Sequence, residues 1–216
     1  CLCPNNSLYM VMGLVEGPTL WEVLRAQQRI CNEGGKAVCA SVGLALAALN
    51  ERGFAHRDVK VTNVMVDTPR NRVVLIDADS CGSFHEPKQR RSSIVGTRHC
   101  MAPEVIAGDH SLTCDWWSLG VMLFELLSGE PPFWEGADRP PLEQQHGESL
   151  RHPGCLNPGA DEVIGTLLQA DENKRCCDLR ALKNHDWLHE EEFDWRGLES
   201  GEAPLPATLS VRRVVF

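Results

Sequence analysis

The sequence predicts an α+β fold that is mainly helical and contains one short β-hairpin. Long segments carry apolar residues at helical spacing or are apolar on every side, as buried helices are. Two short Val-rich runs are instead separated by a segment in which five residues, 67–71, have strong turn chemistry, which is the pattern of a hairpin. The 216 residues, 43% of them hydrophobic, suffice for one large domain or one domain with appendages.

The first two elements are a strand and a helix. Residues 8–15 form an almost wholly apolar run that stops at Gly17 and Pro18, which favours a buried strand followed by a turn. Apolar residues at helical spacing follow over residues 19–30, and Thr19 is available as the N-cap. We expect the chain to pass from strand to helix at this turn.

Three further helical regions follow. Residues 36–51 are rich in Ala and Leu and predict a buried helix closed by Gly53. Residues 115–128 are apolar nearly all round, which indicates a central helix buried on every side. Residues 159–188 carry further helical patterns. Residues 189–216 are charged and then rich in Pro and Gly, so we expect a tail that is partly extended and has no period of its own.

The hairpin lies between the second helix and the central one. Residues 64–66 and 73–76 are the expected strands. A hairpin centred on Arg70 would place Asn63 opposite Asp77 at its open end. The sequence therefore predicts that these two side chains meet beside the loop that precedes the first strand.

That loop carries the sequence HRDVKVTN, which brings chemically active groups close together. Asp58, Asn63 and Asp77 would together supply two carboxylates and an amide oxygen, the ligands that Mg²⁺ prefers. Lys60 lies two residues after Asp58 and could place a positive charge on a phosphoryl group. The spacing therefore favours phosphoryl transfer.

Composition excludes several other classes of protein. A net charge of −9 argues against broad nucleic-acid binding. The ten cysteines are scattered without a C-x-x-C pair, which favours reduced thiols in the cytoplasm over a disulfide scaffold. No apolar run approaches the ~18 residues of a membrane span. The chain begins at Cys1 in the middle of a pattern, so we expect it to be a fragment.

Five motifs in one order resemble the eukaryotic protein kinase family. HRDVKVTN at residues 56–63 resembles the catalytic loop H-R-D-x-K-x-x-N. The four others lie at residues 8–24, at 96–104 ending in Ala-Pro-Glu, at 115–120 (DWWSLG), and at 171–175 with 185–187. The resemblance covers about residues 8–190. The amino-acid sequences of the central helix and of the tail are most similar to those of the AGC group, especially the cyclic-nucleotide-dependent kinases.

The resemblance implies a kinase fold represented mainly by its helical C-lobe. Residues 1–18 would be the last N-lobe strand and the hinge, residues 19–188 the C-lobe, and residues 189–216 an AGC-like C-terminal tail. The glycine-rich loop, the strand lysine and the helix-C glutamate of the family are not in this sequence. We therefore expect residues 1–216 alone to bind ATP weakly and to transfer no measurable phosphate.

The resemblance also assigns catalytic roles. Asp58 would orient the substrate hydroxyl and accept its proton, and Lys60 would steady the γ-phosphate of ATP. Thr97 would tie these two residues to the segment that docks the substrate, which favours Ser and Thr as acceptors. Asn63 and Asp77 would hold the Mg²⁺ ions that bridge the ATP phosphates.

ATP would lie against the hinge. Met12 would be the gatekeeper, the backbone from Gly13 to Val15 would face the adenine, and Met65 would form the floor beneath it. Asp77 would contribute to the same site through the metal.

Other residues would have structural or regulatory roles. Asp115 would brace the catalytic loop through backbone amides, and Glu104 would form a buried ion pair with Arg175. Ser93 lies four residues before Thr97, where the family carries an activating phosphate. A phosphate placed there by an upstream kinase could pair with Arg57 and order the loop.

The sequence departs from the family at several positions. The triplet Asp77-Ala78-Asp79 stands where the family has Asp-Phe-Gly, and Ala78 removes the aromatic ring that stacks on His56. Basophilic AGC kinases also carry glutamates where this chain has Thr19 and Thr62. Glu125 is then the main remaining candidate for recognising arginine, so a preference for basic substrates is left open.

Three functions are therefore compatible with the sequence. The leading hypothesis is a serine/threonine protein kinase that uses ATP and Mg²⁺, with a protein substrate and no nucleic-acid partner. The second is a pseudokinase scaffold with weak or no catalysis. A third and weaker hypothesis is a zinc-binding adaptor built on Cys100, His110 and Cys114, which show no complete metal-site spacing.

Overall fold

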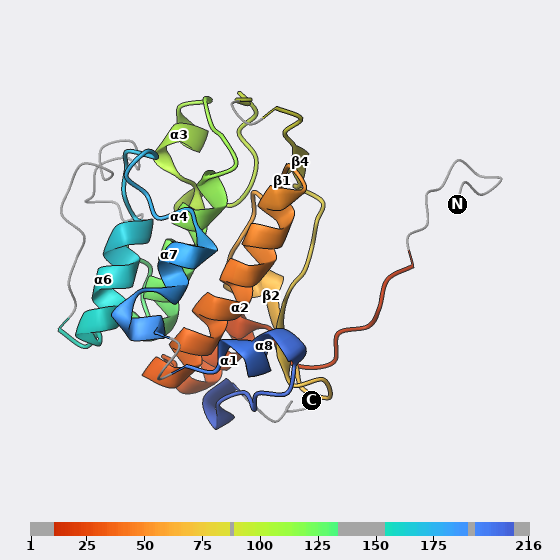
Figure 1. The fold of residues 1–216 in the computed structure, drawn as a ribbon, viewed down its shortest axis with the longest axis vertical. Helices are drawn as coiled ribbons and strands as arrows, with labels where there is room; N and C mark the ends of the chain where they lie inside the picture. The colour runs from red at the N-terminus through yellow and green to blue at the C-terminus, as the bar shows by residue number, and fades with distance from the viewer. Residues whose placement is uncertain (1–10, 87–88, 134–153, 190–192, 210–216) are drawn as a thin grey trace.

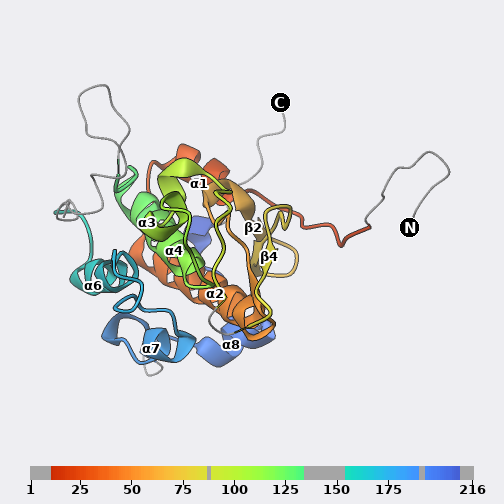
Figure 2. The ribbon, with the colours of Figure 1, turned by 90° about the horizontal axis from the view of Figure 1, so that it is seen from above.

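Two buried helices form the centre of the fold. The computed structural model describes residues 11–86, 89–133, 154–189 and 193–209. Helix α2 (Asn32–Glu51) packs against α4 (Cys114–Ser128), and α6 (Pro158–Leu167) packs on α4. Figures 1 and 2 show α6 on one side of this pair and the hairpin strand β2 on the other.

The first two helices begin at side-chain caps. Helix α1 (Leu20–Gln27) starts at Thr19, which forms a reciprocal capping box with Glu22, so the predicted N-cap is confirmed. Helix α2 starts four residues earlier than predicted, because the Sγ of Cys31 accepts a hydrogen bond from the Gly34 amide. Cysteine is not among the residues preferred at N-caps, which is why the sequence pattern missed this start.

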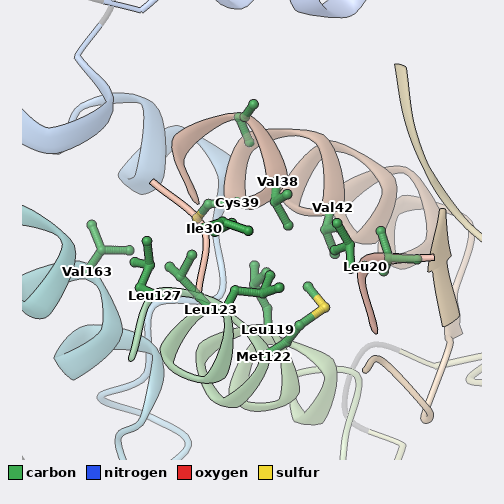
Figure 3. Close-up of a cluster of buried hydrophobic side chains, with 14 of the residues drawn as sticks. Leu20, Ile30, Val38, Cys39, Val42, Leu119, Met122, Leu123, Leu127 and Val163 are labelled. Carbon is green, nitrogen blue, oxygen red and sulfur yellow. The ribbon is translucent and has the colours of Figure 1, made fainter. Parts of the chain in front are cut away.

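The core lies between α2 and α4 (Figure 3). Side chains of α2, such as Val38 and Val42, face Leu119 and Leu123 of α4 and are inaccessible to solvent or nearly so. Helix α4 is buried on all sides over almost its whole length, as the sequence predicted. The contact removes apolar surface from water, and burial of this kind is the dominant favourable contribution to folding.

The hairpin forms with a different register from the predicted one. Strands β2 (Val64–Asp67) and β3 (Arg72–Leu75) are antiparallel, and Asp67 pairs with Arg72. The intervening turn has four residues, so its centre falls after residue 69 and not at Arg70. Asn63 therefore lies opposite Ile76, whose amide donates to its carbonyl at 2.8 Å, and the predicted Asn63–Asp77 pairing is wrong.

The remaining elements are short. The two-residue strands β1 (Phe54–Ala55) and β4 (Gly82–Ser83) pair beside the catalytic-loop sequence. The short helices are η1 (Val61–Asn63), η2 (Arg98–Cys100), α3 (Pro103–Ile106), α7 (Leu179–Lys183), η3 (Asp186–Leu188) and η4 (Ala207–Leu209).

The predicted first strand is absent from the part of it that the structure describes. Residues 11–15 have no strand partner among the described residues, and residues 8–10 lie outside them. Figure 1 shows this segment running away from the body. Val11 is 97% and Leu14 73% exposed. An apolar run becomes a buried strand only when a neighbouring strand and a packed face accept it, and the described residues offer neither.

The C-terminal tail is more structured than predicted. Helix α8 (Trp195–Ser200) packs against α2, and Trp195 and Leu209 belong to the same core as the central helices. The Asn71 amide binds the backbone of Ala203 and Leu205, and Gln27 donates to the Thr208 carbonyl at 2.6 Å. The expectation of a tail with no helical period of its own is therefore wrong for residues 195–200, which form α8. Residues 190–192 and 210–216 lie outside the described residues.

The length and hydropathy of a helix decide whether it can span a membrane. In the described part of the chain, no helix is both long enough and apolar enough to span a bilayer.

The turn of the hairpin depends on a buried carboxylate. The Asp67 side chain is fully buried and accepts hydrogen bonds from Arg70 and Arg72, each at 3.2–3.3 Å. Burial alone raises the pKa of Asp67, but the bonds and charges of the two arginines outweigh it and lower the pKa below its ordinary value. A carboxyl whose pKa is lower in the folded chain stabilises the fold above its unfolded pKa of about 3.9.

We expect Asp67→Asn to lower the free energy of unfolding at pH 7 by ~1 kcal/mol, since both arginines are half-exposed. The wild-type free energy should fall as the pH drops below about 4, because Asp67 becomes protonated there in the unfolded chain while it is still ionised in the folded chain, and the variant should show a smaller fall. Urea unfolding at a series of pH values measures both. The exposed Glu51→Gln variant is the control, and an equal pH dependence in wild type and Asp67→Asn would contradict the assignment.

Candidate active site

The carboxylate of Asp58 lies at the centre of a small hydrogen-bond network. The Thr97 hydroxyl donates to its Oδ1 at 2.7 Å, and the Lys60 ammonium donates to its Oδ2 at 2.7 Å. Lys60 also donates to the Thr97 hydroxyl oxygen at 2.8 Å, which closes the network. The structure thus brings together three predicted site residues, one of which is 37 positions from Lys60.

Asn63 holds the same carboxylate from the other side. Its side-chain amide donates to Oδ2 and to the backbone carbonyl of Asp58, both at 2.9 Å. Burial tends to raise the pKa of Asp58, but the hydrogen bonds from Lys60, Thr97 and Asn63 and the charge of Lys60 prevail and lower it. The group is therefore an ionised carboxylate with a fixed orientation at neutral pH, as a proton acceptor must be.

The loop that carries Asp58 is anchored to the central helix. The buried carboxylate of Asp115 accepts the backbone amides of His56 at 2.6 Å and Arg57 at 2.7 Å, so the predicted contact is present. Burial raises the pKa of Asp115 even though both amides favour its ionised form. A ring nitrogen of His56 lies 3.0 Å from the Ile76 carbonyl and links the loop to the end of the hairpin.

The segment before Thr97 approaches the loop very closely. Gly96 has a φ of +112°, and a Cβ at this position would lie 2.2 Å from the carbonyl oxygen of Arg57. Only glycine adopts this conformation at this distance without displacing the loop. From the sequence, Gly96 had no role of its own, so its part in allowing Thr97 to reach Asp58 was missed.

The oxygens that could hold a metal ion are available. Asn63 uses its amide nitrogen on Asp58, whereas its Oδ1 has one long contact of 3.4 Å, with Thr62. Asp77 is exposed, and its Oδ1 receives one contact of 3.5 Å, from the Asp79 amide. Asp77 also has a φ of +66°, a conformation that few non-glycine residues adopt. One amide oxygen and one carboxylate fit the hard-oxygen preference of Mg²⁺.

The exposed Ser93 contacts Arg57 of the loop that carries Asp58. The Arg57 guanidinium donates to the Ser93 hydroxyl at 2.9 Å and to the Ser80 carbonyl at 2.7 Å. A phosphate on Ser93 would therefore form next to a cation that is already positioned by the chain.

The predicted ion pair between Glu104 and Arg175 is present. Arg175 donates to both carboxylate oxygens of Glu104, one of them at 2.9 Å, and to two backbone carbonyls. Its guanidinium also stacks over the Trp117 ring, with 5.3 Å to the ring centroid. The Arg175 side chain has no exposed surface and that of Glu104 has 10%.

A cavity of about 470 Å³ opens beside the Asp58 network. Lys60 and Thr97 line one part of it, and Trp21 and Phe133 supply aromatic walls. Glu125 lies in the same wall, where burial raises its pKa, and its Oε2 has no hydrogen-bond partner among the described residues. The cavity is large enough for a protein side chain that presents a hydroxyl to Asp58.

The predicted ATP-binding residues of the hinge are not assembled into one site. Met65 is half-buried and pairs with Thr19 in an isolated β-bridge, but Met12 is 76% exposed. Gly13 and Val15 belong to the same segment, which runs away from the body (Figure 1). Their role in adenine binding stays a prediction.

A comparison with known protein families matches one family model to this chain. The family model described as "protein kinase domain" matches residues 2–188, which is most of the chain. The chain belongs to the protein kinase family. Its helical core and short hairpin thus correspond to the C-lobe of the kinase fold.

Curated relatives place this kinase chain near the AGC type. It is 32% identical over 213 residues to a cAMP-dependent protein kinase catalytic subunit of Arthrobotrys oligospora, covering 96% of this chain and 40% of the relative. It is 30% identical to the serine/threonine-protein kinase AtPK1/AtPK6 of Arabidopsis thaliana, over 90% of this chain and 42% of the relative. It is 28% identical to protein kinase C zeta type of Oryctolagus cuniculus, over 95% of this chain and 36% of the relative. The chain thus spans about two fifths of the length of these relatives.

The three residues of the zinc hypothesis, Cys100, His110 and Cys114, are buried in the packed interior of this kinase chain. Cys100 and Cys114 are buried, and burial raises the pKa of both thiols. His110 is buried against Phe84, and burial lowers its pKa. Over the described ranges, no group of three or more His, Cys, Asp or Glu side chains is placed to hold a metal ion.

Proposed function

We propose that the intact protein containing this chain transfers the γ-phosphate of ATP to serine and threonine hydroxyls of proteins. The observation that carries the proposal is the ionised Asp58 carboxylate, fixed by Lys60, Thr97 and Asn63 at the edge of an open cavity. Three relatives whose names specify serine/threonine kinases support the choice of acceptor.

Each residue of the network has a distinct part in this mechanism. Asp58 orients the substrate hydroxyl and accepts its proton as the oxygen attacks phosphorus. Lys60 compensates negative charge on the phosphoryl group, and Thr97 fixes the distance between Lys60 and the carboxylate. Asn63 and Asp77 would hold Mg²⁺, which would neutralise charge on the ATP phosphates.

The regulation we propose uses Ser93 and an upstream activating kinase. A phosphate on Ser93 would place a charge of about −1.5 to −2 beside the Arg57 guanidinium and replace the present hydroxyl contact by charge-assisted bonds.

We also propose a cytoplasmic location, since the cysteines in the described residues are free thiols.

We expect Ser93→Ala to lower the activity of the intact protein isolated from its native cells, because Arg57 then loses the phosphate that orders the activation segment. Mass spectrometry of the wild type should find phosphate on Ser93. The neighbouring exposed Ser92→Ala is the matched control and should retain activity. Unchanged activity in Ser93→Ala would show that this serine is not the switch.

A non-catalytic scaffold is the second candidate, and one observation favours it. Ala78 and Asp79 stand where the family has Phe and Gly, and both are exposed in the structure. Ala78 cannot fill the position of the aromatic ring that would stack on His56. Asp79 adds a second carboxylate beside Asp77, where it could repel ATP phosphates. These changes would lower the population of the active arrangement without removing Asp58 or Asp77.

The experiment that separates the two candidates compares three forms of the intact protein at saturating Mg·ATP. We expect weak but measurable phosphate transfer by the wild type and a higher kcat for Ala78→Phe with Asp79→Gly, because the stacking contact is restored. Asp77→Asn is expected to be inactive, since it removes a charged metal ligand. Equal background rates in all three proteins would overturn the kinase proposal and leave the scaffold.

A further inference from the structure

A second cavity, of about 400 Å³, lies away from the Asp58 network. It is formed where the N-terminal end of α2 approaches that of α6, at the lower end of the molecule in Figure 1. Arg29, Cys31, Leu127 and Cys155 are among its lining residues. None of them lines the cavity beside Asp58.

Two thiols in this cavity differ from the others in the described residues. Cys31 and Cys155 are the exposed cysteines there, and both line the same cavity. Cys39 is buried and Cys177 half-buried, and burial raises the pKa of each thiol to about 12. Those thiols stay protonated and are poor nucleophiles, whereas Cys31 and Cys155 are accessible to a reagent in solution.

The surroundings of Cys31 suit a reactive sulfur. Its Sγ accepts the Gly34 amide at 3.3 Å and lies 3.0 Å from the Thr208 hydroxyl. Two hydrogen-bond contacts thus fix the position of the sulfur at the start of α2. Cys155 has no hydrogen bond to any residue that the structure describes, so its side chain can turn towards an adduct on Cys31.

Arg29 supplies charge to the same cavity. It is exposed, and across the described ranges its guanidinium is in no ion pair. A guanidinium binds carboxylates strongly, so the cavity favours a reagent that carries carboxylate groups.

We propose that Cys31 and Cys155 form a redox-active thiol pair that reacts with small disulfides bearing carboxylates, of which oxidised glutathione is the test case. The Cys31 thiolate attacks one sulfur of the disulfide, whose S–S bond breaks and releases one small thiol. The Cys155 thiolate then attacks the Cys31 sulfur of the adduct and releases the second small thiol. Two protein thiols are oxidised and one small disulfide is reduced to two thiols. This inference does not depend on the proposed kinase activity.

The modification has a direct structural consequence. Once the Cys31 sulfur is bonded to another sulfur, its thiol hydrogen is gone and the contact with Thr208 changes. Thr208 is also held by Gln27, so two contacts attach this part of the tail to the corner between α1 and α2. Oxidation of Cys31 should therefore loosen the tail at this corner.

The test uses the intact protein, oxidised glutathione and peptide mapping by mass spectrometry. We expect the wild type to form a Cys31–Cys155 disulfide, and Cys155→Ser to stop at a glutathione adduct on Cys31. Cys31→Ser should form no protein disulfide, and the half-buried Cys81 is the internal control. A wild type that stops at the adduct, or Cys81 reacting as fast as Cys31, would overturn the pair.

Two further measurements test the ligand class and the consequence. Arg29→Gln should slow the reaction with oxidised glutathione several-fold relative to a neutral hydroxyethyl disulfide, whereas Arg25→Gln, outside the cavity, should not. Amide hydrogen exchange over residues 205–209 should increase when the disulfide forms. An unchanged ratio of the two rates in Arg29→Gln would refute the carboxylate preference, and unchanged exchange would refute the link to the tail.

Discussion

Replacing Asp58 with Asn is expected to lower kcat of the intact protein by about 10²–10⁴-fold, the usual loss when a general base is removed. An asparagine keeps the size of the side chain and one acceptor oxygen, which can still accept from Lys60, while its amide nitrogen can donate to the Thr97 hydroxyl oxygen, so the fold should survive. It cannot accept the substrate proton, however. The loss should therefore appear in kcat, with a small change in the KM for ATP.

Radiolabelled phosphate transfer at saturating Mg·ATP measures this effect. The exposed Glu130→Gln variant is the matched control, because it removes one carboxylate charge outside the network. Circular dichroism and urea unfolding should show that Asp58→Asn is folded. If the folded variant keeps more than half of the wild-type kcat, Asp58 is not the proton acceptor.

The second large effect concerns stability. Arg175→Met is expected to lower the free energy of unfolding by about 3–5 kcal/mol, because it leaves the Glu104 carboxylate buried without its partner. The variant also loses the bonds to the carbonyls of Thr113 and Gln169. The helix-rich core should remain the same, so the loss should be seen in the unfolding midpoint and not in the slope with urea.

The double variant Glu104→Gln with Arg175→Met is the control for this prediction. It removes both charges, so its loss of stability should be clearly smaller than the sum of the two single losses. Losses that add without any coupling would show that the ion pair contributes nothing beyond the separate contacts of each residue.

Helices were predicted well where pattern and tertiary environment agree. The all-round apolar run at residues 115–128 became α4, since such a run can be buried only at the centre of a domain. Residues 8–15 were equally apolar, but a strand needs a neighbour, and periodicity cannot say whether one is present. Helix α8 has six residues and is held by Trp195 in the core, so local pattern could not reveal it.

In the candidate site, too, some contacts were predicted from the sequence and others were missed. The contact between Asp58 and Thr97 was predicted from motifs far apart in sequence, and the structure contains it. The hairpin register was missed by one residue, because turn residues indicate where a chain reverses and do not fix the length of the loop. The aromatic wall formed by Trp21 and Phe133 was also missed, since each residue alone reads as an ordinary surface or core side chain.

The docking of the tail onto the first helices also determines when this domain can complete its folding. Gln27 and Thr208 are 181 residues apart in sequence, yet they are in direct contact. During synthesis, the corner between α1 and α2 leaves the ribosome long before its covering segment exists. The apolar surface that Trp195 and Leu209 bury must stay uncovered, or be shielded by a chaperone, until the tail has emerged. Closing so distant a contact late makes the last stage of folding slow, and translation arrest before residue 195 should leave an aggregation-prone nascent chain.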